Sequence, residues 1–107
     1  MQVVHCKTAP AGSFVYIGRP TPAGNPFVLR NPKDDAERME VIARYKEWFL
    51  DNIGINADLQ NFVETLRGRD LGCYCAPRPC HGDVIIEWLN DNPREYYIEP
   101  EVWDRDA

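Results

Sequence analysis

The chain has 107 residues and a formal net charge of −5, with 44% hydrophobic and 27% charged residues. This length and balance fit one domain with its own core, and the negative charge argues against non-specific binding to duplex nucleic acid or to an anionic membrane. No apolar run approaches the ~20 residues of a membrane span. The first residues, MQVVHCKTAP, lack the basic and apolar regions of a secretion signal, so we expect a cytoplasmic protein with reduced thiols.

Two short strands and a proline-rich loop are predicted at the start of the chain. QVVHC at 2–6 fits a short strand, and SFVYIG at 13–18 fits a stronger one because it is rich in aromatic and β-branched residues. The segment GRPTPAGNPF at 18–27 follows. Its three prolines remove backbone donors and its Gly-Asn pair favours a turn, so it is predicted to be a loop.

Three helices and a further strand are predicted in the rest of the chain. Apolar residues at steps of three and four predict helices over 32–54, 57–68 and 81–91. DLGCYC at 70–75 is predicted to be a strand. The segment 93–107 is acidic and aromatic, and we expect it to be a tail that packs on the domain or extends it.

The order strand, strand, helix, helix, strand, helix is typical of an α/β fold. We therefore expect a single small domain over 1–92, with a short, mainly parallel sheet of about three to four strands and three helices packed on it. In such sheets, ligands bind beyond the carboxyl ends of the strands. The loops at 18–27 and 73–83 both follow predicted strands, and they would meet at one edge of the sheet if those strands are parallel neighbours.

The second loop, CYCAPRPCHGD at 73–83, holds three of the four cysteines. On a strand, Cys73 and Cys75 would point to the same side. Cys80 falls near the start of the third helix, where unpaired N–H groups favour an anion and lower the pKa of a thiol. Burial is the ordinary alternative, because cysteine packs like a small apolar residue.

The leading hypothesis is a two-loop pocket for a compact anionic ligand of nucleotide or nucleoside type, either for catalysis or for sequestration. Arginine binds phosphate or carboxylate in a two-pronged manner. The predicted ligand-binding residues are Gly18, Arg19, Gly24, Asn25, Arg78, Gly82 and Asp83. The predicted catalytic residues are Cys75, Cys80 and His81, with Cys80 or Cys75 as nucleophile and His81, or alternatively His5, as its base.

Each of these polar residues also has a simpler interpretation. Asn25 can form its own turn, Asp83 can cap the third helix, and His81 can bond to a backbone carbonyl. A solvated surface position is the alternative for Arg19 and Arg78.

Two other classes of function stay open. Cys73, Cys75 and Cys80 could hold zinc or an iron–sulfur cluster, with His81, His5 or Cys6 as a fourth ligand, although their spacing is not the familiar C-x2-C. The chain could instead bind a protein partner or a second copy of itself through its tail, which carries the aromatic residues Tyr96, Tyr97 and Trp103.

Two segments of the sequence resemble one family. They are G-R-x-x-x-x-G-N-P-F, at 18–27, and L-x-C-x-C-x-P-x-x-C-H-G-D, at 71–83. With ARYKEWFL between them, they resemble the prokaryotic and phage family called domain of unknown function 4326, over roughly residues 14–90 of this chain. The resemblance names no activity. It implies that the polar residues of the two loops belong together, which points to a site. A phage-type interaction protein that acts on a host factor through the tail is one form of the partner-binding alternative.

Overall fold

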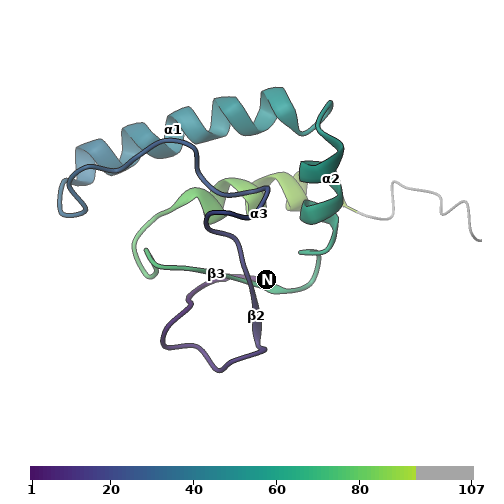
Figure 1. The fold of residues 1–107 in the computed structure, drawn as a ribbon, viewed down its shortest axis with the longest axis horizontal. Coiled ribbons are helices and arrows are strands. Elements are labelled where there is room, and N and C mark those ends of the chain that lie inside the picture. The colour runs from purple at the N-terminus through teal and green to yellow at the C-terminus, as the bar shows by residue number, and fades with distance from the viewer. Residues whose placement is uncertain (94–107) are drawn as a thin grey trace, which may run out of the picture.

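Three parallel strands and three helices make up residues 1–93, which are the residues that the computed structural model describes (Figure 1). The strands are β1 (Val3–His5), β2 (Phe14–Tyr16) and β3 (Asp70–Cys73). The helices are α1 (Asp35–Asn52), α2 (Ala57–Glu64) and α3 (His81–Asp91). The α/β fold with a short parallel sheet is therefore confirmed. The predicted tail at 93–107 lies outside the described residues, apart from Pro93.

The last strand in the chain is the central strand of the sheet. The strand order is β1-β3-β2, and β3 pairs in parallel with both neighbours. Leu71 is opposite Val3 on one side and Val15 on the other. Because β2 and β3 are parallel neighbours, the loops after them leave the same edge of the sheet, as the sequence predicted.

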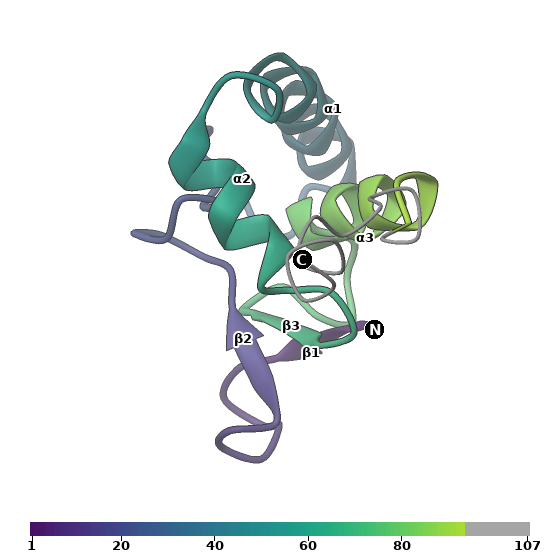
Figure 2. The ribbon, with the colours of Figure 1, turned by 90° about the vertical axis from the view of Figure 1, so that its right-hand side faces the viewer.

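The helices lie on one side of the sheet. In both ribbon views α2 and α3 lie next to the strands, and α1 lies farther out, beyond α3 (Figures 1 and 2). The connection between β1 and β2 extends to the opposite side. Fully buried side chains fill the space between these layers: Ile17, Tyr45, Phe49, Leu59, Val63, Leu66, Leu71 and Ile85.

All elements except the third helix end earlier than the sequence predicted, including the second helix and the last strand. The predicted helix 57–68 stops at Glu64, because the next residues make tighter turns, such as Leu66 N–H to the Val63 carbonyl at 3.0 Å. Gly68 then takes a positive φ of 74° and turns the chain into β3. The predicted strand 70–75 stops at Cys73, which leaves Tyr74 and Cys75 in the loop. In residues 1–93 no helix has the length and apolar character needed to cross a membrane.

Candidate functional site

A cavity of about 380 Å³ lies where the loops after β2 and β3 meet α1. The sequence predicted a pocket shared by these two loops, and the structure brings residues of both to one cavity. Seven residues named by the sequence line it: Gly18, Arg19, Asn25, Cys73, Cys75, Cys80 and His81.

The loop after β2 is held largely by its own turns. The Thr21 N–H and hydroxyl both donate to the Gly18 carbonyl, at 2.9 and 2.6 Å. The Gly24 N–H donates to the Thr21 carbonyl at 2.9 Å, and Asn25 Oδ1 accepts from the Phe27 N–H at 2.8 Å. The Asn25 oxygen therefore forms a turn, as the simpler interpretation proposed. Its Nδ2 group remains a donor at the cavity.

A tyrosine of α1 anchors this loop from the core. The Tyr45 hydroxyl donates to the Ala23 carbonyl at 2.7 Å, and both residues are fully buried. Burial raises the pKa of Tyr45 far above its ordinary value, so the phenol stays protonated and donating. The loop is thus tied to α1 at a point that water does not reach.

The start of α3 is tied to the end of β2 by His81. Its Nε2 lies 2.9 Å from the Ile17 carbonyl, and its ring packs edge-on against Tyr45 with centroids 5.0 Å apart. Burial lowers the pKa of His81, so the ring is neutral and donates Nε2–H to that carbonyl. Only Nδ1 is then left to accept a proton from a thiol, and the predicted role as a base depends on that atom.

Three thiols line the cavity floor. The sulfur atoms of Cys73 and Cys80 are 3.2 Å apart, and the Cys75 N–H donates to Cys73 Sγ at 3.4 Å. The bond from Cys73, supported by the N–H of Gly82, lowers the pKa of Cys80. The pKa of Cys75 is strongly raised, because its thiol donates to Cys73 and is partly desolvated. Cys80 is therefore the most acidic of the three thiols.

Arg38 of α1 is a site residue that the sequence analysis missed. Its side chain is only 5% exposed and lines the cavity. Nη1 donates to the Pro79 carbonyl at 3.2 Å and Nη2 to the Pro32 carbonyl at 2.9 Å. Its buried Nε has no hydrogen-bond partner within residues 1–93. The signal was present in the sequence: Arg38 falls on the same helical stripe as Val41, Ile42 and Tyr45.

Four predicted ligand-binding residues lie outside the cavity lining. Gly24 forms a turn so close to the Arg19 backbone that a Cβ would lie 2.9 Å from Arg19 Cα. Gly82 packs against β1 and β2, where a Cβ would lie 2.8 Å from Val3 Cγ2. These glycines allow close packing of the chain on itself, which is a structural role.

Asp83 and Arg78 likewise make structural contacts. Asp83 accepts from the Cys80 N–H at 3.1 Å and completes a capping box at the start of α3, as the simpler interpretation proposed. Arg78 donates to the Pro32 carbonyl at 2.7 Å and lines a separate depression beside α1. Arg19, by contrast, is exposed and lines the cavity, where its guanidinium can meet an anion.

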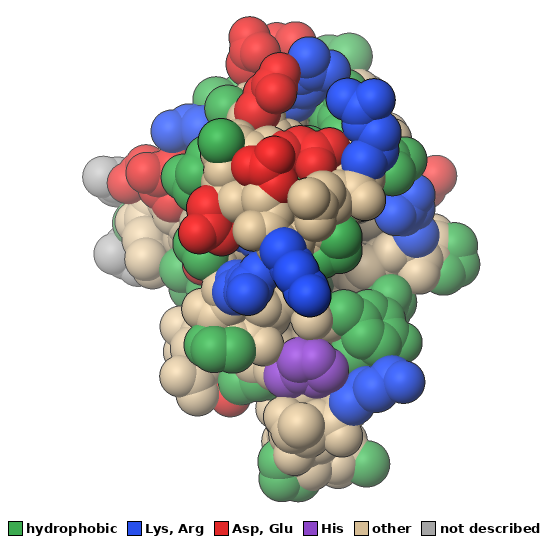
Figure 3. Space-filling view, turned by 90° about the vertical axis from the view of Figure 1, so that its left-hand side faces the viewer, with side chains coloured by type: hydrophobic (Ala, Val, Ile, Leu, Met, Phe, Trp, Pro, Cys, Tyr) green, Lys and Arg blue, Asp and Glu red, His purple; other side chains and the backbone are tan. Residues whose placement is uncertain are grey.

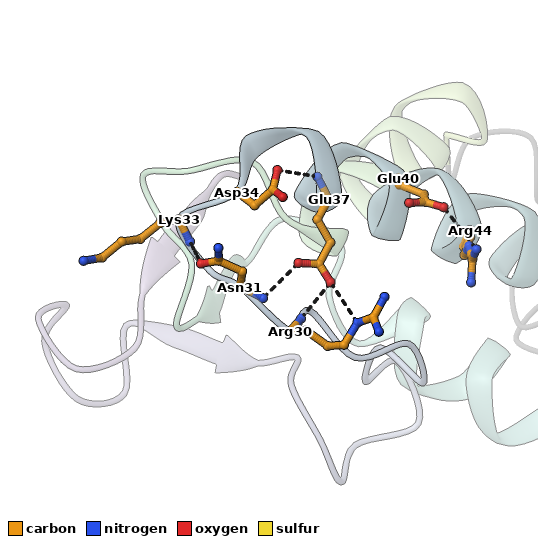
Figure 4. A network of polar contacts seen from close by, with 7 residues as sticks. All are labelled: Arg30, Asn31, Lys33, Asp34, Glu37, Glu40 and Arg44. Carbon is orange, nitrogen blue, oxygen red and sulfur yellow. Dashed lines mark hydrogen bonds and ion pairs between the residues drawn. The ribbon is translucent and has the colours of Figure 1, made fainter.

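Glu37 holds the segment that joins the first loop to α1 (Figure 4). Its carboxylate accepts from the N–H groups of Arg30 and Asn31, both at 2.9 Å. Asp34 caps the helix by accepting from the Glu37 N–H at 3.0 Å. The bonds from the backbone of Arg30 and Asn31 lower the pKa of Glu37. Val28 and Leu29, just before this anchored segment, form part of the cavity wall.

Charges of both signs are mixed on the face that carries the start of α1. Figure 3 shows acidic side chains over the upper part of this face, and Lys and Arg side chains among and below them. The negative net charge is therefore not spread evenly over the surface. An anion can approach a molecule with such a distribution.

The metal alternative has no geometric support in the described part of the chain. Within residues 1–93 no group of three or more His, Cys, Asp or Glu side chains is placed to hold a metal ion. His5 lies outside the cavity lining, and its Nδ1 accepts from the Lys7 N–H at 3.1 Å. Cys6, the other outlying candidate ligand, also lies outside that lining.

Comparison with known proteins agrees with the resemblance seen in the sequence. The model of the family described as Domain of unknown function (DUF4326) matches residues 2–91. The chain belongs to this family. It is also 40% identical over 58 residues to the "uncharacterized 12.4 kDa protein in nrdA-td intergenic region" of Enterobacteria phage T4. That match covers 54% of each chain, so this protein aligns with about half of its phage relative. No solved structure matches this chain.

Proposed function

We propose that the cavity between the two loops binds a compact anionic ligand of nucleotide or nucleoside type. The observation that carries the proposal is the buried guanidinium of Arg38, which lines the cavity and interacts with the Cys75 thiol, and whose Nε makes no hydrogen bond within residues 1–93. A buried N–H without an acceptor costs free energy, and a phosphate or carboxylate oxygen would recover it. The protein–carbonyl bonds at Nη1 and Nη2 hold the guanidinium in place for that contact.

The size of the cavity suits a small molecule. Small-molecule sites commonly have volumes of about 300–1,000 Å³, and this cavity has about 380 Å³. A nucleoside monophosphate is therefore a better match than a dinucleotide or a polymer.

Aromatic side chains support a ligand with a planar ring. Tyr16, Phe27 and Tyr74 all line the cavity, and the rings of Tyr16 and Tyr74 meet edge to face with centroids 6.0 Å apart. Rings of this kind stack on nucleobases. Burial raises the pKa of Tyr16, so its hydroxyl stays protonated and can donate to a polar edge of the ligand.

Arg19 and Asn25 supply further polar contacts from the first loop. Arg19 adds a second, exposed guanidinium, and Asn25 adds its Nδ2 donors. From the second loop, Cys80 is the thiol best placed to react with an electrophilic ligand, because its pKa is lowered. Cys75 and His81 line the same cavity.

Calorimetric titration with nucleoside 5′-monophosphates, the matching nucleosides and inorganic phosphate tests the proposal. We expect a monophosphate to bind and Arg38→Lys to weaken it about tenfold or more, because a charged hydrogen bond contributes about 1.5–3 kcal/mol. Arg44→Lys is the matched control, since Arg44 is on the same helix but exposed and paired with Glu40. The proposal fails if nothing in the panel binds, or if both variants bind as the wild type does.

A further inference from the structure

Two thiols touch at the inner wall of the cavity. Cys73 ends the central strand and Cys80 caps α3, and each is only 3% exposed. Their sulfur atoms lie 3.2 Å apart. A disulfide bond is about 2.05 Å long, so the sulfurs need to approach by only about 1.2 Å to form one.

The environment of the pair gives the two sulfurs different roles. Cys80 Sγ accepts from the Gly82 N–H at 3.2 Å, within the first turn of α3, and the contact with Cys73 together with this N–H lowers its pKa. The pKa of Cys73 is raised: a bond from Cys75 lowers it, but donation to Cys80 and burial outweigh that effect. Cys80 is thus the thiol that ionises first. Cys73 is positioned to attack Cys80 Sγ once Cys80 has formed a mixed disulfide.

The cavity makes this buried pair reachable. Both cysteines line the 380 Å³ space that also contacts Arg19 and Asn25 of the first loop. A buried thiol pair with no such space would be inert packing, which is the ordinary role of buried cysteine. Cys6 shows the contrast, because it is more exposed than the pair but does not line the cavity.

We propose that Cys73 and Cys80 form a redox-active dithiol that reduces small organic disulfides entering the cavity. The Cys80 thiolate attacks one sulfur of the disulfide R–S–S–R. A mixed disulfide forms on Cys80, and the released RS⁻ takes up the proton that Cys80 lost. Cys73 then loses its proton and attacks Cys80 Sγ, which breaks the mixed bond and releases the second RSH. The small disulfide is reduced to two thiols, and the protein is oxidised to the Cys73–Cys80 disulfide.

This activity needs no anion beside Arg38, so it stands apart from the proposed function. Either proposal can fail while the other holds. Excess small thiol, of the same class as RSH, returns the protein to its dithiol form by the reverse steps.

The test uses the full chain, fully reduced and then exposed to 2-hydroxyethyl disulfide. After an acid quench, remaining thiols are alkylated in denaturant and mapped by fragment mass spectrometry. We expect a mass loss of about 2 Da, as two thiol hydrogens leave, with the alkyl label on Cys6 and Cys75 and none on Cys73 or Cys80. This wild-type result does not depend on whether any variant folds.

Variants separate the roles of the thiols. Cys80→Ser should abolish formation of the intramolecular disulfide, because both the attacking sulfur and one atom of the product bond are removed. Cys73→Ser should stop at the mixed disulfide on Cys80, and Cys6→Ser, the matched control, should behave as the wild type. The proposal is overturned if the wild type keeps all four thiols, keeps a mixed disulfide, or joins Cys75 to either partner.

Discussion

The two loops that line the cavity are held by different means. The loop at 18–27 is stabilised by its own backbone turns and by one buried hydroxyl from Tyr45. The loop at 74–80 has one backbone turn, from the Arg78 N–H to the Cys75 carbonyl at 2.8 Å, and depends more on side-chain contacts with other segments. Arg38 reaches the Pro79 carbonyl, and Cys80 Sγ meets Cys73 Sγ.

This difference has a chemical consequence. Asn25 and Gly24, prominent in the first motif, use their polar groups or their small size to shape the loop. Beside the second loop, the Arg38 Nε–H makes no hydrogen bond in the described residues, and the pKa of the Cys80 thiol is lowered. The first loop chiefly shapes the cavity wall, and the groups on which our two proposals depend most lie at the second loop and at Arg38 of α1 beside it.

The largest expected effect comes from the close packing behind the second loop. In Gly82→Val the new Cβ would meet Val3 Cγ2 at 2.8 Å and Ile17 Cδ1 at 2.9 Å. We expect the free energy of unfolding to fall by about 3 kcal/mol, the upper end of overpacking costs. Gly54→Val is the control, because nothing lies within 4 Å of a Cβ there. Equal urea midpoints for the two variants would contradict the packing of α3 on β1 and β2.

The anchor of the first loop should contribute less. Tyr45→Phe leaves the buried Ala23 carbonyl without its donor, and we expect a loss of about 1.5 kcal/mol in the free energy of unfolding. Tyr16→Phe is the matched control, since Tyr16 is only half-buried. Urea denaturation followed by circular dichroism measures both. A Tyr45→Phe protein as stable as Tyr16→Phe would show that the anchor is dispensable.

Loss of one polar side chain from each loop should lower the free energy of unfolding by smaller amounts. Asp83→Ala breaks the capping box at α3 and should cost about 1 kcal/mol. Asn25→Ala breaks only the bond from the Phe27 N–H, and we expect about 0.5 kcal/mol. Thermal unfolding of both variants measures the order. If Asn25→Ala proved the more damaging, the first loop would depend on that single turn more than its other bonds suggest.

The smallest expected effect is a pH dependence of stability due to His81, which links the start of α3 to the Ile17 carbonyl. The ordinary pKa of histidine is 6.5, and that of folded His81 is lower. The unfolded chain therefore takes up this proton first as the pH falls, and stability declines as the pH drops below about 6.5. His81→Gln should flatten that decline. Urea midpoints measured from about pH 7.5 downward, in steps of about one pH unit, show the difference. A variant with the same slope as the wild type would mean that His81 is not responsible.

Glu37 acts in a separate acid range. The pKa of its carboxylate is lowered below the ordinary 4.5 by bonds from the Arg30 and Asn31 N–H groups, so its contribution to stability is complete above that value and is lost as the pH falls further. The decline due to His81 begins near the ordinary histidine pKa of 6.5, and that due to Glu37 begins only near the ordinary value of 4.5. The decline attributed to His81 can therefore be read before that of Glu37 begins.

Much of this architecture could be predicted from the sequence. The three- and four-residue steps of apolar side chains located the helices, and short β-branched segments located the strands. The sequence also placed both polar loops after strands and predicted that they would meet if those strands were parallel neighbours, and the strand order in the structure meets that condition. The cysteine-rich motif and the Gly-Asn-Pro-Phe motif were expected to form one region, and residues of both line the same cavity.

Only the tertiary structure decided which atoms meet. Helical periodicity places Arg38 on the inner stripe of α1, but the reach of its long side chain to the Pro32 and Pro79 carbonyls depends on how three separate segments pack. The contact between Cys73 and Cys80 depends on β3 being central and on α3 starting directly above its end. Local sequence patterns determine elements and their faces, whereas distances between side chains far apart in the chain arise from packing and carry no local signal.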